Sequence, residues 1–156
     1  MKCIFLDIDG VFNTTADNNK IHTKFNNIRI VFDVDLLNYF LDIFKFCKEN
    51  KIMIYITSSI AINTTIYDWE WYFKETFRLN VNGIILGVDY KQNLDRGLAI
   101  QNVLDYYKEE IKDYLIIDDS ISDIKDYHDE YKIIEIDNRY GITILDMEYL
   151  YLITID

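Results

Sequence analysis

Five short apolar runs, separated by helical patterns, constrain the fold of this chain more than any other feature. The runs are Lys2–Leu6, Ile52–Ile56, Ile84–Leu86, Tyr114–Ile117 and Ile133–Ile136. Each is nearly continuous and rich in β-branched or aromatic residues, which is typical of strands buried on both faces of a parallel sheet. We therefore expect a parallel sheet of about five strands.

Helical patterns lie between these runs. One apolar helix face is formed by Val34, Leu37, Leu41, Phe44 and Cys47, and a second by Ile100, Val103, Leu104, Tyr107 and Ile111. Weaker helical patterns cover residues 65–78 and 143–153. Alternating strands and helices predict helices on both faces of the sheet, in a single α/β domain over residues 1–156.

Charge and composition exclude several classes of protein. The 156 residues include 27 acidic and 16 basic side chains, and the net charge of −11 disfavours broad electrostatic binding of nucleic acid. No apolar run approaches the ~20 residues of a membrane-spanning helix, and the first residues do not resemble a secretory signal. Cys3 and Cys47 are expected as reduced, buried thiols. We expect a cytoplasmic protein without a membrane segment.

The polar residues after the first run are candidates for function, because ligands of open α/β sheets bind at the carboxyl ends of the strands. This run ends in Asp7-Ile8-Asp9-Gly10. Residues i and i+2 of an extended segment point the same way, so both carboxylates face one site, and their repulsion suggests bound Mg²⁺. Gly10 allows a sharp turn or a positive φ. The alternative interpretation is a pair of acids that cap a turn.

Two further strand ends are polar. Thr57-Ser58-Ser59 follows the second run and offers hydroxyl and N–H groups to a phosphate, although an ordinary helix cap is the alternative. Asp118, Asp119 and Asp123 follow the fourth run. One acid would suffice as a helix cap, so the surplus suggests a site for a hard cation.

In their order along the chain, these strand ends resemble the first, second and fourth motifs of the haloacid dehalogenase-like (HAD) phosphohydrolases. The matching residues are Asp7-Ile8-Asp9-Gly10-Val11, Thr57, and Asp118-Asp119 with Asp123. The segments FLDIDGVFN, NGIILG, RGLAI, YLIIDD and IDNRYGIT also resemble the small HAD domains associated with RNA-repair proteins, over nearly the whole chain. The resemblance implies a three-layer α/β/α sandwich with a Rossmann-like sheet of order 3-2-1-4-5 and no large cap domain.

The resemblance also implies roles for these residues. Asp7 would be the nucleophile that forms an aspartyl-phosphate, and Asp9 would be the general acid and base. Thr57, helped by Ser58, would bind the transferring phosphoryl group. The groups that would hold Mg²⁺, directly or through water, are the carboxylates of Asp7, Asp118, Asp119 and Asp123 and the backbone carbonyl of Asp9.

Two residues compete for the lysine that the family usually has before its fourth motif. Arg96 is favoured, because it lies at a predicted helix start beside Gly97, and Lys91 stays as the alternative. Arginine binds phosphate bidentately but does not mimic a compact ammonium group.

Residues 13–33 lie where the family has its flap or cap, and they are too few for a separate cap domain. Within them, residues 18–32 contain Lys20, Lys24 and Arg29 and no acidic residue. One interpretation is a clamp on a phosphorylated substrate, and the other is a surface hairpin with scattered charges.

Together these features predict a Mg²⁺-dependent phosphatase that acts through Asp7. The resemblance suggests a nucleotide or a nucleic-acid terminal phosphate as the substrate. The alternatives are a non-catalytic HAD-like domain that binds metal and phosphate, and a phosphate-transferring mutase, which normally needs a larger cap. His128, after the fourth motif, is expected at the surface, and the oligomeric state stays open.

Overall fold

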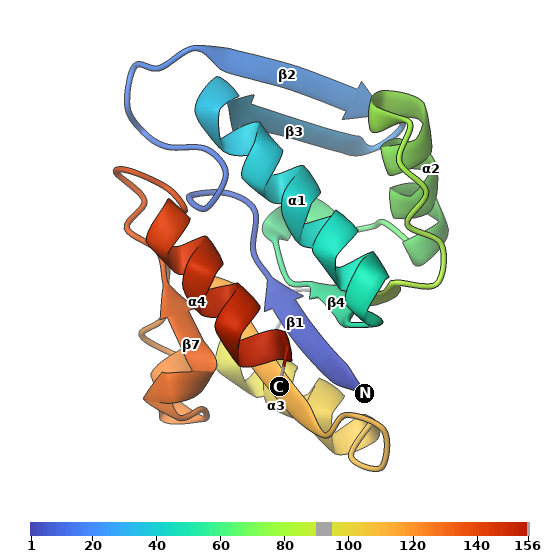
Figure 1. The fold of residues 1–156 in the computed structure, drawn as a ribbon, viewed down its shortest axis with the longest axis vertical. Coiled ribbons are helices and arrows are strands. Elements are labelled where there is room, and N and C mark those ends of the chain that lie inside the picture. Colours follow the sequence, from blue (N-terminus) through green and yellow to red (C-terminus); the bar gives the residue numbers. More distant parts are fainter. Residues whose placement is uncertain (90–94, 156) are drawn as a thin grey trace.

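The protein, seen here as a computed structural model, is described over residues 1–89 and 95–155 (Figure 1). Its strands and α-helices are, in chain order, β1 (Lys2–Leu6), β2 (Lys20–Phe25), β3 (Ile28–Asp33), α1 (Val34–Asn50), β4 (Met53–Ile56), α2 (Ile66–Phe77), β5 (Ile85–Val88), α3 (Arg96–Tyr106), β6 (Asp113–Asp118), β7 (Ile133–Glu135) and α4 (Ile144–Ile155). No helix in these two ranges is long and apolar enough to cross a membrane.

Five parallel strands form the central sheet, in the order β5-β4-β1-β6-β7. Counted among themselves, these strands have the order 3-2-1-4-5 that the family resemblance implied. The numbering differs only because β2 and β3, which form a separate hairpin, precede β4 in the chain. The register places Leu6 of β1 beside Ile56 of β4 and Ile117 of β6, so the residues that follow these three share one edge of the sheet.

Helices cover both faces of the sheet, as predicted. The core on one face includes Ile4 and Leu6 of β1 and side chains from α1, α2 and α4. The core on the other face includes Cys3 and Phe5 of β1 and is covered by α3. Figure 1 shows α1 and α4 in front of the sheet and α3 behind it. This burial on both faces explains why the strands occur as continuous apolar runs.

The buried stripe of α1 differs from the predicted one. It consists of Leu36, Phe40, Ile43, Phe44 and Cys47. Val34 is 42% exposed at the start of the helix, so its place in the predicted face was wrong. The hairpin explains the difference, because Phe32 of β3 packs against Phe40 of α1. Their ring centroids are 4.9 Å apart, so the hairpin buries this side of the helix.

Residues 13–33 contain the antiparallel β2–β3 hairpin, which packs against the helices. Ile28, Ile30 and Phe32 on one side of β3 are fully buried. The Thr23 hydroxyl of β2 is hydrogen-bonded to the Tyr72 hydroxyl of α2 at 2.6 Å. The hairpin is therefore part of the core on the α1 side of the sheet.

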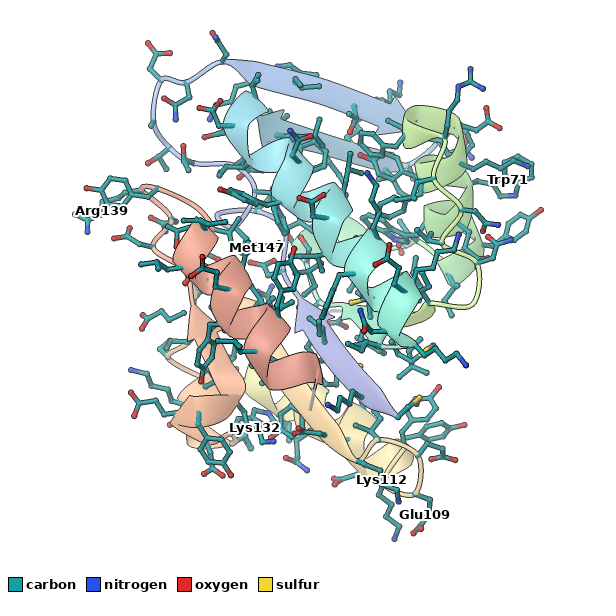
Figure 2. All side chains as sticks on the ribbon, in the orientation of Figure 1. Trp71, Glu109, Lys112, Lys132, Arg139 and Met147 are labelled. Carbon is teal, nitrogen blue, oxygen red and sulfur yellow. The ribbon has the colours of Figure 1, made fainter. Side chains whose placement is uncertain are left out.

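Two smaller features complete the fold. Cys3 and Cys47 are free and buried, as expected. Figure 2 shows Met147 on α4 and Arg139 projecting from the loop that precedes this helix. Met147 is buried in the core, whereas the Arg139 side chain is 71% exposed.

Candidate active site

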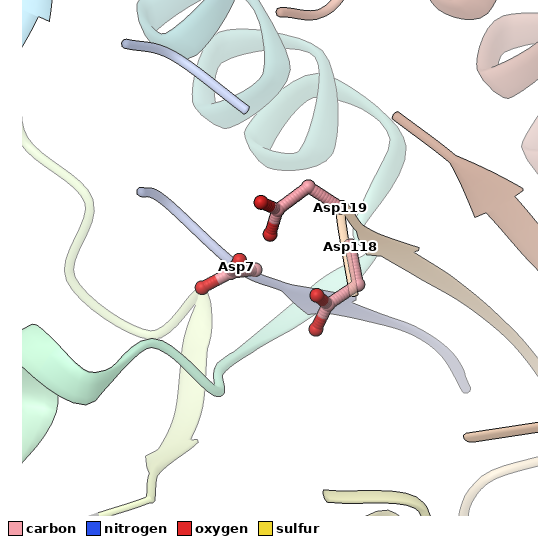
Figure 3. Close-up of side chains that lie close together, drawn as sticks. All are labelled: Asp7, Asp118 and Asp119. Atoms are coloured by element: carbon pink, nitrogen blue, oxygen red, sulfur yellow. The ribbon is translucent and has the colours of Figure 1, made fainter. Parts of the chain in front are cut away.

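Three carboxylates meet where β1 and β6 end (Figure 3). Asp7 directly follows β1 and its N–H donates to the Ile117 carbonyl at 3.0 Å, while Asp118 ends β6 and Asp119 follows it. One oxygen of each carboxylate lies within 4.8 Å of the others. Asp7 and Asp118 are buried, at 3% and 0% exposure. Such a set of hard oxygen donors fits Mg²⁺.

The electrostatics of this cluster favour a bound cation or proton. Burial raises the pKa of Asp7, and the neighbouring Asp118 carboxylate raises it further, while Arg96 opposes the rise. Burial also raises the pKa of Asp118, against the effects of Arg96 and of a hydrogen bond from the Ser120 N–H. Like charges this close raise each other's pKa, and a nearby cation opposes that rise.

Arg96 places a positive charge beside these carboxylates. It is the first residue of α3, and its Nη1 lies 2.7 Å from Asp118 Oδ2 and 3.6 Å from Asp7 Oδ2. The structure thus brings the Arg96 guanidinium to the carboxylates of Asp7 and Asp118. Lys91, the alternative, lies outside the described residues.

The loop after β6 holds the start of α3. Asp123 Oδ2 accepts hydrogen bonds from the N–H groups of Arg96 at 2.6 Å and Gly97 at 3.4 Å. His128 Nε2 donates to the Gly97 carbonyl and Nδ1 accepts from the Tyr114 hydroxyl, each at 2.9 Å. Asp123 is therefore bound to the helix start and does not join the three-carboxylate cluster. The expectation of a surface His128 was wrong, because this side chain is 6% exposed.

Asp9 lies apart from the three carboxylates. Its side chain is exposed, and its Oδ1 accepts a hydrogen bond from Asn13 Nδ2 at 3.0 Å. β1 ends at Leu6 and a turn begins at Asp9, so the alternation of an extended strand does not continue to this residue. The structure therefore brings Asp7, and not the Asp9 side chain, to the predicted metal site.

Gly10 lies against the cluster. Its φ of +81° is the positive value that the sequence allowed for. A Cβ at this position would stand 2.1 Å from Asp119 Oδ2. Only glycine therefore fits both the turn and the carboxylate.

The hydroxyl residues after β4 lie next to β1 in the sheet. The Thr57 N–H donates to the Leu6 carbonyl at 2.9 Å, and the Thr57 side chain is buried. Ser58 is also buried, and its hydroxyl accepts from the Ile60 N–H at 3.4 Å, where it caps the short 3₁₀ helix Ser59–Ala61. Ser58 thus forms the helix cap that was the alternative interpretation, while Thr57 stands beside Asp7.

The three cations of the hairpin have different surroundings. Lys20 forms an ion pair with the buried Asp33 and donates to the Thr14 carbonyl at 2.9 Å. Lys24 and Arg29 are exposed and lie opposite each other near the hairpin turn. The structure thus uses Lys20 within the fold and leaves Lys24 and Arg29 facing solvent.

Two asparagines at the site were missed by sequence reasoning. Asn13 binds Asp9, and Asn138 Nδ2 donates to Asp119 Oδ2 at 3.4 Å. Both lie in segments that carried the family resemblance, FLDIDGVFN and IDNRYGIT. A single amide has no characteristic spacing, so only this membership in matching segments could have indicated them.

Comparison with known families agrees with this geometry. A family model described as the HAD domain in Swiss Army Knife RNA repair proteins matches residues 3–147. Searches of the curated proteins and of the solved structures found no match. The matched range contains all the site residues described above.

Proposed function

The chain belongs to the family of HAD domains in Swiss Army Knife RNA repair proteins, and on this basis we propose that it is a Mg²⁺-dependent phosphatase. Membership indicates a phosphohydrolase type of function. The proposed reaction hydrolyses a phosphate monoester through an aspartyl-phosphate on Asp7.

One observation carries the proposal: three carboxylates and a guanidinium group meet at the carboxyl edge of the sheet, beside the buried Thr57. Phosphoryl transfer needs mainly positioning and neutralisation of charge. The carboxylates of Asp7, Asp118 and Asp119 would hold Mg²⁺, which supplies charge neutralisation for the transferring group when bound. Arg96 and Thr57 would bind the phosphoryl oxygens.

In the proposed reaction, an oxygen of Asp7 forms a bond to phosphorus while the bond between phosphorus and the leaving oxygen breaks. Asp9 gives a proton to that leaving oxygen and later takes a proton from the water that attacks the aspartyl-phosphate. The products are the alcohol, inorganic phosphate and the restored carboxylate of Asp7. The position of Asp9 outside the three-carboxylate cluster supports this role.

A nucleotide or a nucleic-acid end is the proposed substrate. The description of the family supports this choice. The segment 13–33 forms a hairpin and not a separate cap domain, which fits a substrate too large to be enclosed. The exposed pair Lys24 and Arg29 offers charge to further phosphates of such a substrate.

The test is phosphate release from 4-nitrophenyl phosphate, nucleoside monophosphates and oligonucleotides with a 3′- or 5′-phosphate, with Mg²⁺ or with EDTA. Asp7→Asn should lower turnover at least roughly a thousandfold, because the amide is a poor nucleophile. Asp42→Asn, an exposed site on α1, is the matched control and should leave turnover unchanged.

The alternative is a domain that binds metal and phosphate without catalysis. Mg²⁺ and inorganic phosphate would then raise the melting temperature while no substrate is hydrolysed. That result would contradict the proposed phosphatase.

A further inference from the structure

Asn13 uses its whole side-chain amide to connect three parts of the site. Its Oδ1 accepts from the Gly10 N–H at 3.0 Å. Its Nδ2 donates to Asp9 Oδ1 at 3.0 Å and to the Val31 carbonyl at 2.7 Å. An amide nitrogen has two hydrogens, so both donors of Asn13 are in use.

The contact with Asp9 restricts a side chain that is otherwise exposed. The Asn13 amide nitrogen can only donate a hydrogen bond, so Asp9 Oδ1 acts as the acceptor. In the proposed reaction, Asp9 Oδ2 would then be the oxygen that carries and transfers the proton. An acid that works at a reacting oxygen must present one defined oxygen at hydrogen-bond distance, and a misplacement of about 1 Å costs much of the rate.

Asn13 is itself held by rigid structure. The Val31 carbonyl belongs to β3. The residues on either side of Val31 in this strand, Ile30 and Phe32, are fully buried. The Asp33 N–H donates to the Phe12 carbonyl at 3.0 Å, which ties the loop to the same strand. A site residue supported by a packed strand keeps its orientation better than one supported by a free loop.

We propose that Asn13 is a positioning residue that fixes the carboxylate of Asp9 for proton transfer to and from the reacting oxygens. This inference rests on the proposed phosphatase function. When the alcohol leaves, the bond between phosphorus and oxygen breaks, and the proton moves from Asp9 Oδ2 to the alcohol oxygen. The Asn13 N–H remains bound to the resulting carboxylate, where the hydrogen bond is charge-assisted.

The test compares two leaving groups. 4-Nitrophenolate departs without a proton, whereas the sugar hydroxyl of a nucleoside monophosphate needs one. General acid catalysis contributes about 10²–10⁴-fold, so Asn13→Ala should lower kcat/KM for the nucleoside monophosphate roughly tenfold more than for 4-nitrophenyl phosphate. This ratio does not respond to a general loss of folded protein, which affects both substrates equally.

A second variant and a control keep the test decisive if Asn13→Ala folds poorly. Asn13→Asp keeps an acceptor for the Gly10 N–H but cannot donate to Asp9, and it should change the ratio in the same direction. Thr14→Val removes a hydroxyl that donates to Asp33 Oδ2 at 2.6 Å in the same loop. It should lower the melting temperature without changing the ratio of the two substrates.

A double-mutant cycle shows whether Asn13 acts through Asp9. In an Asp9→Asn background, Asn13→Ala should lower kcat/KM little further, because the group that it positions is already absent. An unchanged substrate ratio in both Asn13 variants, with an active wild-type protein, would overturn this inference alone. A wild-type protein that hydrolyses no phosphate ester would overturn the proposed function, and this inference with it.

Discussion

At the scale of single residues, Gly10 and Gly83 form a natural comparison. Their φ values are +81° and +82°, but a Cβ on Gly10 would strike Asp119 whereas one on Gly83 would meet nothing within 4 Å. Gly83→Ala should therefore lower the free energy of unfolding by about 1–2 kcal/mol, which is the cost of the left-handed conformation for a residue with a Cβ. Gly10→Ala should cost more, because Asp119 must also move.

The two variants differ in what they do to the metal site. Denaturant unfolding gives the free energies, and melting curves with and without Mg²⁺ give the metal response. We expect Gly83→Ala to keep the full Mg²⁺ response and Gly10→Ala to lose most of it. An equal response in both would show that Asp119 tolerates the displacement.

At the scale of elements, the first turn of α3 sets the position of Arg96. A Cβ on Gly97 would stand 2.6 Å from the Asp123 carbonyl oxygen. Gly97→Ala should therefore push the start of α3 away from the loop that follows β6. Turnover should fall at least roughly tenfold, because the proposed role of Arg96 is to bind the phosphoryl oxygens of the reacting group. The measurement is kcat together with the melting temperature.

Gly87 provides the matched control for this change. A Cβ there would lie 2.5 Å from the Tyr55 ring, so Gly87→Ala is also crowded, but the crowding is against β4 and not against the loop after β6. It should destabilise the fold and leave kcat per folded molecule unchanged. Equal losses of kcat in both alanine variants would indicate a general effect of crowding.

The three cations of the hairpin differ in role. Lys20 forms an ion pair within the fold, whereas Lys24 and Arg29 face solvent. Lys20→Gln removes the ion-pair partner of the buried Asp33 and should cost about 1–3 kcal/mol of unfolding free energy. Replacing both Lys24 and Arg29 with Gln should barely change stability. It should instead raise KM for phosphorylated oligonucleotides roughly threefold, and not KM for 4-nitrophenyl phosphate.

Salt provides the check on that explanation. The attraction between two exposed cations and a polyanion is screened within about 8 Å at physiological ionic strength. The difference in KM should therefore disappear as salt is added. A difference that persists at high salt would mean that Lys24 and Arg29 shape the site by contact.

At the scale of the whole molecule, stability should depend on pH and Mg²⁺ together. The pKa of Asp7 is raised in the folded chain, so the folded state holds this proton more tightly than the unfolded chain does. The corresponding stability is full below about pH 4 and is lost as the pH rises toward the folded pKa. The metal-free protein should thus melt at a lower temperature at pH 8 than at pH 5.

Mg²⁺ should reverse this trend, because it binds the ionised carboxylates and competes with protons. At about 100 times its Kd, it should raise the melting temperature by roughly 5–10 °C, and more at pH 8 than at pH 5. Asp33 and Asp113 have lowered pKa values, so their contributions are lost only in more acidic solution. Asp7→Asn should flatten the metal-free pH dependence, and an unchanged slope in that variant would contradict the assignment to Asp7.

The sheet was predictable because a strand that is buried on both faces appears in the sequence as a continuous apolar run. The continuous run of β1 and the run within β6 follow directly from their central positions. The hairpin strands were not placed, although Lys20–Phe25 alternates in polarity as a half-buried strand does. The buried face of α1 depended on Phe32 of that hairpin, so this error followed from the first.

The site was predictable as far as strand ends determine it. Asp7 directly follows β1 and Asp118 ends the adjacent strand β6, so their proximity follows from the strand order. The separation of Asp9 and Asp123 from the cluster could not be predicted, because a carboxylate suits a helix end, a turn or a metal equally well. Which of these it meets depends on where the turn begins and how closely α3 approaches.

The packing of the hairpin determines how substrate would enter the site and how product would leave it. Ile28, Ile30 and Phe32 belong to the main core, so β3 cannot swing aside as a lid without opening that core. Amide protons of β3 should therefore exchange with deuterium as slowly as those of β1, which open only with global unfolding. The proposed substrate, a nucleic-acid end, would then enter the site, and the product would leave it, without a movement of β3.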